Sequence, residues 1–167
     1  PIQYIFSEIN KSINEAISQF DWKDDMDQLK ERVPYVGEVF LGHVRYGTYG
    51  DNSLESVHPF LRQNNWMHRN LILAGNFNMT NVNELFDQLV ELGQHPKEKT
   101  DTVTVMEKIG HFLDTEVRKL YKNLKAEGYT KKEASPHIVK QLKIAKILRK
   151  ASKDWDGGYV MGGMLGH

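Results

Sequence analysis

The chain has 167 residues, which fits one domain with a substantial core. Its 22 Lys and Arg residues balance 22 Asp and Glu residues, so no net charge favours binding to nucleic acid or to an anionic membrane. No cysteine is present, which excludes disulfides, thiolate metal sites and a cysteine nucleophile within these residues. Without an apolar run of about 20 residues or a signal segment, we expect a cytoplasmic protein.

The first half of the chain alternates between helical and strand patterns. Residues 6–20 place apolar side chains at three- and four-residue spacing, which predicts a helix. Residues 24–33 predict a second, short helix that Pro34 ends. β-Branched and aromatic residues predict strands over 36–46 and 66–74. The second strand is almost continuously apolar, so we expect it to be covered on both faces.

The second half is mainly helical. Asn81, with Glu84 three residues later, predicts the cap of a helix that Gly93 stops. A long helix is expected over 102–126, and another with Ser135 as its N-cap and Pro136 at its first position. We interpret the cations of residues 140–153 as a solvated face rather than a nucleic-acid site. A glycine-containing strand is expected over 159–165. Together the elements predict an α+β domain in which helices pack on a sheet.

Three places carry candidate chemistry. Arg45 lies at the end of a predicted strand and faces a glycine turn, where its guanidinium could bind a carboxylate beside Thr48; pairing with a surface acid is the alternative. Asn76, in a predicted turn, could stabilise an oxyanion with a nearby backbone N–H, or serve only as a turn residue. Asp101 could recognise an ammonium group, or could simply be a helix N-cap.

A metal site is not expected. His43, His58 and His68 match no zinc spacing, and no helical pair links them.

The ordered motifs G-H-V-R-Y-G-T-Y-G (42–50), H-P-F (58–60) and N-F-N-M-T-N (76–81) resemble the class II glutamine amidotransferase domain, an N-terminal nucleophile hydrolase. The amidophosphoribosyltransferase branch of purine synthesis is the most similar, since Tyr46 and Phe60 distinguish it from the glucosamine-phosphate synthase branch. The resemblance implies a four-layer αββα sandwich, here incomplete because its N-terminal strands are missing. We therefore expect residues 1–167 to be a single, partial domain cut from a longer protein.

The resemblance also implies roles for individual residues. Arg45 would bind the α-carboxylate of glutamine with Thr48 beside it, and Asp101 would receive the α-ammonium. Asn76, through its side-chain amide, and Phe77, through its backbone N–H, would form the oxyanion hole. Two positions depart from the family pattern, which has histidine in place of Gly75 and glycine in place of Phe77.

The family's nucleophile is an N-terminal cysteine, which this chain lacks. We therefore expect a glutaminase-domain fragment that does not itself hydrolyse glutamine; a non-catalytic glutamine-binding or regulatory module and a simple interaction domain are the alternatives. The implied partners are L-glutamine, a phosphoribosyltransferase domain of the same parent chain and further copies in a homo-oligomer. No cofactor is expected here, although the missing domain of the parent would use Mg²⁺ with phosphoribosyl diphosphate.

Overall fold

The computed structural model describes residues 2–19, 27–28, 30, 36–44 and 57–166. The chain forms two compact units, Pro1–Phe40 and Leu41–His167, which are described separately. In the first unit, the expected helix is present as α1 (Ile2–Gln19). Of the predicted helix over 24–33, the described residues 27, 28 and 30 are helical. The strand predicted over 36–46 is wrong for residues 36–44, which have no strand conformation.

The second unit contains a three-stranded antiparallel sheet in the order β1-β2-β3. Its strands are β1 (Phe60–Arg62), β2 (Leu71–Met79) and β3 (Gly157–Leu165). The strand predicted over 66–74 starts later than expected, because residues 67–69 form the 3₁₀ turn η2 (Met67–Arg69). It also continues further, since β3 pairs with β2 from Leu71 opposite Leu165 to Met79 opposite Gly157. Asn76 therefore lies within a strand, and the turn expected there is wrong.

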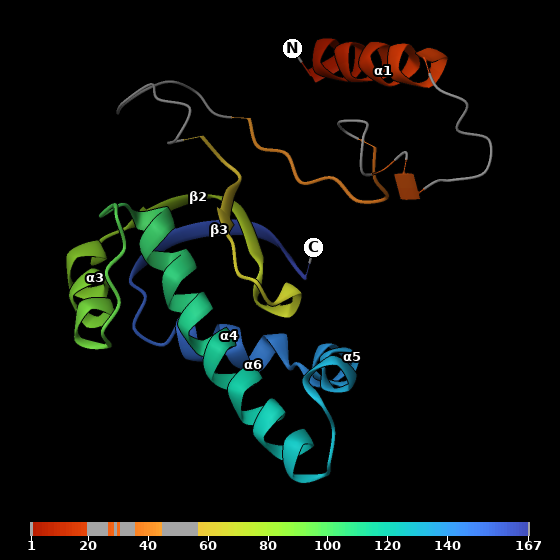
Figure 1. The fold of residues 1–167 in the computed structure, drawn as a ribbon. Coiled ribbons are helices and arrows are strands. Elements are labelled where there is room, and N and C mark those ends of the chain that lie inside the picture. Colours follow the sequence, from red (N-terminus) through yellow and green to blue (C-terminus); the bar gives the residue numbers. More distant parts are fainter. Residues whose placement is uncertain (1, 20–26, 29, 31–35, 45–56, 167) are drawn as a thin grey trace. The chain divides into compact units, whose positions relative to one another are not determined.

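One long helix packs on one face of this sheet, and three further helices pack against that helix (Figure 1). The long helix α4 (Asp101–Ala126) lies along the sheet and contacts β1, β2 and each of the other three helices. These are α3 (Val82–Glu91), α5 (Lys131–Gln141) and α6 (Ile144–Ala151). The α+β class is therefore confirmed, with one sheet and one helical layer among the described residues of this unit.

The core forms where α4 meets alternate residues of β2. Successive side chains of a strand point to opposite faces, and Leu71, Leu73, Phe77 and Met79 pack with buried residues of α4 such as Val105, Ile109 and Leu113. The intervening residues of β2 consequently point to the other face. There Val160 of β3 is 76% exposed and Leu61 of β1 is 50% exposed, so this face carries apolar side chains that the described residues leave open.

Several expected helix signals act differently in the structure. Asn81 makes no capping hydrogen bond to α3; its side chain instead bonds Asp154 O (2.8 Å) and the Asp156 N–H (3.2 Å). α5 begins at Lys131 rather than at Pro136, because Thr130 and Glu133 form a reciprocal capping box. Gly93, with φ of 80°, follows α3 as expected.

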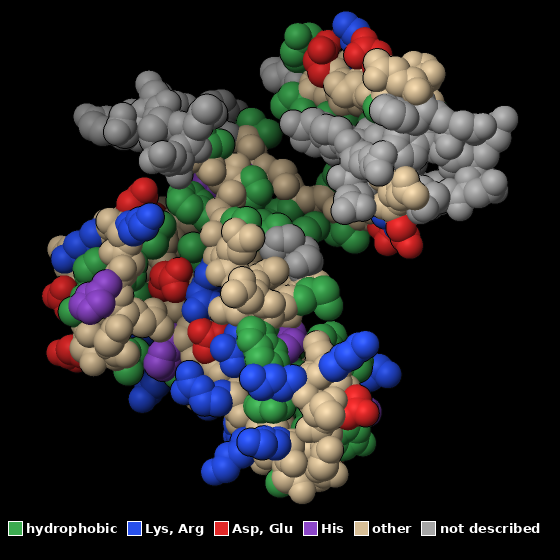
Figure 2. All heavy atoms as spheres, viewed as in Figure 1, with side chains coloured by type: hydrophobic (Ala, Val, Ile, Leu, Met, Phe, Trp, Pro, Cys, Tyr) green, Lys and Arg blue, Asp and Glu red, His purple; other side chains and the backbone are tan. Residues whose placement is uncertain are grey.

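The basic segment over 140–153 lies on the surface, with its Lys and Arg side chains exposed as expected. Figure 2 shows Lys and Arg side chains gathered over the helical side of this unit. No helix in the described parts of the chain is long and apolar enough to cross a membrane.

Candidate functional site

A hydrogen-bonded chain through His58 joins the H-P-F segment to β2 and to the start of α4. The Gly75 N–H in β2 donates to His58 Nδ1 at 3.1 Å. His58 Nε2 lies 3.3 Å from the Thr102 hydroxyl at the start of α4. Thr102 Oγ1 in turn donates to Asp101 Oδ1 at 3.3 Å. The structure thus connects Asp101 to Gly75, the residue that precedes Asn76, although 26 positions separate Asp101 and Gly75 in the sequence.

Three aromatic neighbours hold the His58 ring. The His43 ring lies 4.7 Å away between centroids, with the planes tilted by 30°. Phe60 meets the His58 ring edge-on at 4.9 Å, and Phe77 stacks with it at 6.2 Å. The H-P-F segment and the start of the G-H-V-R motif therefore meet beside residues 75–77 of β2.

Asp101 is not the N-cap of α4. Thr100 is, and its side chain accepts the Val103 N–H at 3.2 Å. Asp101 is the first helical residue, and its Oδ1 accepts the Thr102 N–H at 2.7 Å. The positive end of the helix dipole favours a carboxylate in this first turn. Within the described part of the chain, Asp101 Oδ2 has no protein partner, so this oxygen is available to a cationic group.

Asn76 and Phe77 point to opposite faces of the sheet. The Phe77 ring lies on the α4 side, so the Asn76 side chain, which is exposed, lies on the open face. The Gly75 N–H points away from β3, because it reaches His58. Backbone N–H groups two residues apart in a strand point the same way, so the Phe77 N–H also points away from β3. β1 pairs only with residues 71–73 of β2 and does not extend to Phe77 on that side.

Glycine at position 75 is required by close packing. A Cβ there would lie 2.5 Å from the Val160 carbonyl oxygen and 2.9 Å from the Phe77 ring. The Phe77 ring thus covers the space beside position 75 on the helical face of the sheet. The two departures from the family pattern, Gly75 and Phe77, are consequently coupled, because glycine at position 75 leaves the space that the Phe77 ring occupies.

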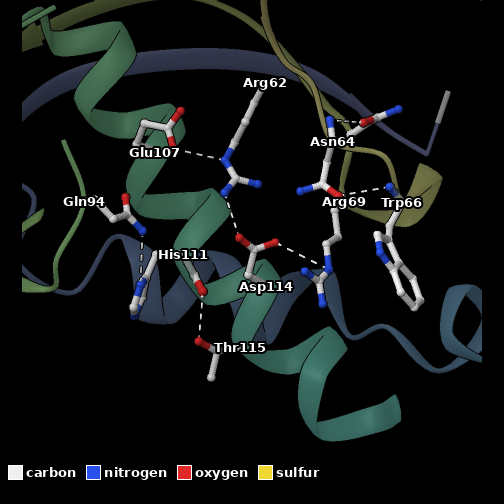
Figure 3. Close-up of polar contacts among 10 residues, drawn as sticks. Arg62, Asn64, Trp66, Arg69, Gln94, Glu107, His111, Asp114 and Thr115 are labelled. Carbon is white, nitrogen blue, oxygen red and sulfur yellow. Dashed lines mark hydrogen bonds and ion pairs between the residues drawn. The ribbon is translucent and has the colours of Figure 1, made fainter. Parts of the chain in front are cut away.

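Arg62 fixes β1, and with it the H-P-F segment, to α4 (Figure 3). Its Nε donates to Glu107 Oε2 at 3.0 Å and its Nη2 donates to Asp114 Oδ2 at 2.7 Å. Arg69 also pairs with Asp114, at 3.7 Å. Burial alone would lower the pKa of Arg62, but its bonds to Asp114 and Glu107 raise it above the ordinary value. Arg62 therefore remains positively charged where it lies against α4.

Gly110 provides the groove that Arg62 crosses. It lies between Glu107 and Asp114 on α4, and a Cβ at this position would be 2.2 Å from Arg62 Nε. The guanidinium can lie flat on the helix only because that side chain is absent. This anchor keeps His58, which lies just before β1, near the first turn of α4.

A second polar anchor holds the other end of the sheet. Lys108, buried within α4, donates to Gln88 Oε1 of α3 at 2.5 Å and lies 3.6 Å from Asp154 Oδ2. Burial lowers the pKa of Lys108, and Asp154 partly opposes that shift. Thr80 also donates to the Asp156 carboxylate. These contacts tie the segment before β3 to α4 and to the end of β2.

Two of the expected site residues, Arg45 and Thr48, lie outside the described residues, so their roles stay predictions. The described residues contain no cluster that could hold a metal ion. His68 lies apart from His58, buried beside Trp66 and 3.4 Å from the Ser135 hydroxyl. Sequence reasoning missed His58 as a junction and Thr102 as a bridge, because only the tertiary fold places them together. The histidine of H-P-F was the available signal.

Comparison with known proteins identifies the class of proteins to which the chain is similar. The relatives are class II glutamine amidotransferases, so the resemblance drawn from the motifs is confirmed. No known family profile matches the chain. No solved structure matches it significantly.

Two kinds of enzyme are found among the relatives. The amidophosphoribosyltransferase of Lacticaseibacillus casei is 38% identical over 80 residues, which is 48% of this chain and 39% of that protein. The Bacillus subtilis enzyme of the same name is 37% identical over 81 residues, 46% of this chain and 16% of its own length. The glutamine--fructose-6-phosphate aminotransferase of Methanocaldococcus jannaschii is 26% identical over 132 residues, 78% of this chain and 11% of that protein. The chain therefore spans well under half of each of these relatives.

Proposed function

We propose that this chain is the glutamine-binding part of a class II glutamine amidotransferase domain. The observation that carries the proposal is the bonded path from Asp101 through Thr102 and His58 to Gly75. It brings the H-P-F segment and the start of α4 to the middle of β2, on the edge that β3 does not occupy. Along this edge a small ligand would reach Asp101 and the Phe77 N–H. The open apolar face of the sheet supports a second sheet layer there, as in the four-layer αββα sandwich.

In this proposal each group has a chemical task. The α-ammonium of glutamine binds Asp101 Oδ2, which has no protein partner within the described residues, and Arg45 with Thr48 binds the α-carboxylate. Asn76 Nδ2 and the Phe77 N–H donate to the amide oxygen as it becomes an oxyanion. Such donors act by being oriented before charge develops. The nucleophile of this reaction is a cysteine thiolate, and the chain has no cysteine.

We further propose that the domain serves an amidophosphoribosyltransferase-like enzyme of purine synthesis in the cytoplasm. The amidophosphoribosyltransferases among the relatives support this choice. Ammonia would pass to a phosphoribosyltransferase domain of the same protein, which would use Mg²⁺ with its diphosphate substrate, and the protein would be a homo-oligomer.

The test is calorimetric titration of this chain with L-glutamine, together with an ammonia-release assay. We expect saturable binding without ammonia release, because the binding groups are present and the nucleophile is not. Asp101→Asn should abolish binding, since the ammonium loses its counter-charge, whereas exposed Glu91→Gln on α3 is the matched control. If the wild-type chain binds no glutamine, the proposal fails. Ammonia release that depends on Arg45 would show that a different mechanism operates.

The departures at Gly75 and Phe77 favour one second candidate, a non-catalytic glutamine sensor. Both candidates predict glutamine binding by this chain. They differ in the longer protein, where a catalytic enzyme releases ammonia from glutamine and a sensor does not.

A further inference from the structure

The His58 imidazole contacts both the β2 segment and the start of α4, the two halves of the proposed glutamine site that the structure describes. Its two ring nitrogens have different partners. Nδ1 lies 3.1 Å from the Gly75 nitrogen, which can only donate. Nδ1 must therefore be an unprotonated acceptor, and in a neutral imidazole the proton then resides on Nε2.

That assignment fixes the direction of the remaining bonds. Nε2–H faces Thr102 Oγ1 at 3.3 Å, so the hydroxyl oxygen accepts. The Thr102 hydroxyl proton is then directed to Asp101 Oδ1, 3.3 Å away. Every donor meets an acceptor, from the Gly75 amide to the Asp101 carboxylate. A reversed tautomer would place two N–H groups against each other at Gly75.

The surroundings hold this arrangement rigidly. His43, Phe60 and Phe77 surround the His58 ring at centroid distances of 4.7, 4.9 and 6.2 Å. Thr102 is only 4% exposed, so its hydroxyl has little access to water. The ring contacts and the two bonds of the imidazole favour one ring orientation, and a hydroxyl shielded from water favours one orientation of the Asp101 carboxylate.

We propose that His58, as its Nε2–H tautomer, is a positioning residue that sets both the Asp101 carboxylate and the Gly75–Asn76 backbone for the ligand. This inference rests on the proposed glutamine site, and it assigns His58 a role without contact to the ligand. Asp101 Oδ1 accepts from the Thr102 N–H and hydroxyl, which leaves Oδ2 as the oxygen for the ligand in this proposal. The same ring holds the Gly75 N–H, one residue before the Asn76 amide.

The first experiment reads the tautomer directly and needs no ligand. The ¹⁵N NMR spectrum of the imidazole in the whole chain should report Nδ1 as the unprotonated nitrogen of His58. The Gly75 amide should exchange slowly with solvent, because it is hydrogen-bonded. An Nδ1–H tautomer, or rapid exchange of the Gly75 amide, would overturn the proposal whether or not glutamine binds.

Two substitutions separate the two arms of the imidazole. His58→Asn places an amide oxygen near the Nδ1 position, so the slow exchange of Gly75 should survive while the link to Thr102 is lost. His58→Gln places an amide N–H near the Nε2 position, so the link to Thr102 should survive while the Gly75 amide exchanges rapidly with solvent. Both should weaken glutamine binding by about tenfold, the loss expected for one hydrogen bond. Wild-type affinity in both variants would refute a positioning role.

A pair of threonine variants isolates the bridge. Thr102→Val keeps the shape but removes the hydroxyl, and it should weaken glutamine binding by about tenfold. Thr104→Val is the matched control, because Thr104 is equally buried in α4 but bonds only the Thr100 carbonyl oxygen, at 2.6 Å. Equal affinities in the two variants would contradict the proposal. If the wild-type chain shows the expected tautomer but binds no glutamine, the proposed function fails and the network is purely structural.

Discussion

Replacing Gly110 by alanine tests whether the Arg62 anchor stabilises the fold. The new Cβ would lie 2.2 Å from Arg62 Nε and 2.6 Å from Cδ, so the arginine must leave its groove. Its bonds to Glu107 and Asp114 would break while both acids remain largely buried, with side-chain exposures of 24% and 20%. Breaking a buried ion pair costs about 3–5 kcal/mol.

The higher helix propensity of alanine partly offsets this loss of stability. Alanine favours a helix over glycine by about 1 kcal/mol, so the expected net loss is about 2–4 kcal/mol of unfolding free energy. At about 2–4 °C per kcal/mol for a chain of this size, the melting temperature should fall by roughly 5–15 °C. Urea unfolding followed by circular dichroism measures the free energy.

The decisive control uses an Arg62→Ala background. Alanine has no atoms at the Cδ and Nε positions that the new Cβ would meet, so Gly110→Ala should there stabilise the chain by up to about 1 kcal/mol. The sign of the substitution thus reverses with the residue at position 62. If Gly110→Ala has the same effect in both backgrounds, the groove has no role in holding Arg62.

Three further predictions concern β2, a buried histidine and a helix cap. Gly75→Ala should lower the free energy of unfolding by about 1–3 kcal/mol through overpacking against Val160 O and Phe77. Gly42→Ala is the control and should not lower it, because a Cβ there meets nothing within 4 Å. Equal stabilities of the two variants would contradict the packing argument. Burial lowers the pKa of His68, so the unfolded chain binds more protons than the folded chain below about pH 6.5. The free energy of unfolding should therefore fall as the pH drops from that value through the lowered pKa. A pH series of urea unfolding should show a shallower fall in His68→Gln. Thr130→Ala should cost about 1 kcal/mol by removing the capping box of α5, while Thr115→Ala, at an exposed hydroxyl on α4, should cost less; the same urea titrations would show it.

The sequence predicted the helices and the sheet best where an element is long and its pattern is periodic. α3 and α4 match expectation because their apolar residues recur at helical spacing, and Gly93 ends one of them. Short-range sequence signals gave wrong predictions where two of them competed. Thr130 with Glu133 caps α5 more effectively than Ser135 does, since both directions of the box are bonded. At 75–78 the glycine and asparagines favoured a turn, but pairing with β3 overrode that local preference.

The candidate site was partly predictable for a different reason. Motif resemblance proposed Asp101, Asn76 and Phe77 as site residues without geometry, and their roles stay predictions. It did not reveal the path through Thr102 and His58, because a hydroxyl and an imidazole acquire these roles only when tertiary contacts bring them together. Arg62 was missed because its partners, Glu107 and Asp114, follow it by 45 and 52 positions.

The pairing of β2 with β3 has a consequence for how the chain folds. During synthesis the central strand emerges long before its longest partner, since α3, α4, α5 and α6 all come between them. Until β3 arrives, the edge of β2 that it will occupy offers unpaired backbone groups to any neighbouring chain. Non-local pairing of this kind slows folding. Helices that form early on one face can hold β2 in place until β3 completes the sheet, and a ribosome-stalled chain that ends before residue 157 should therefore be more prone to aggregation than one that includes β3.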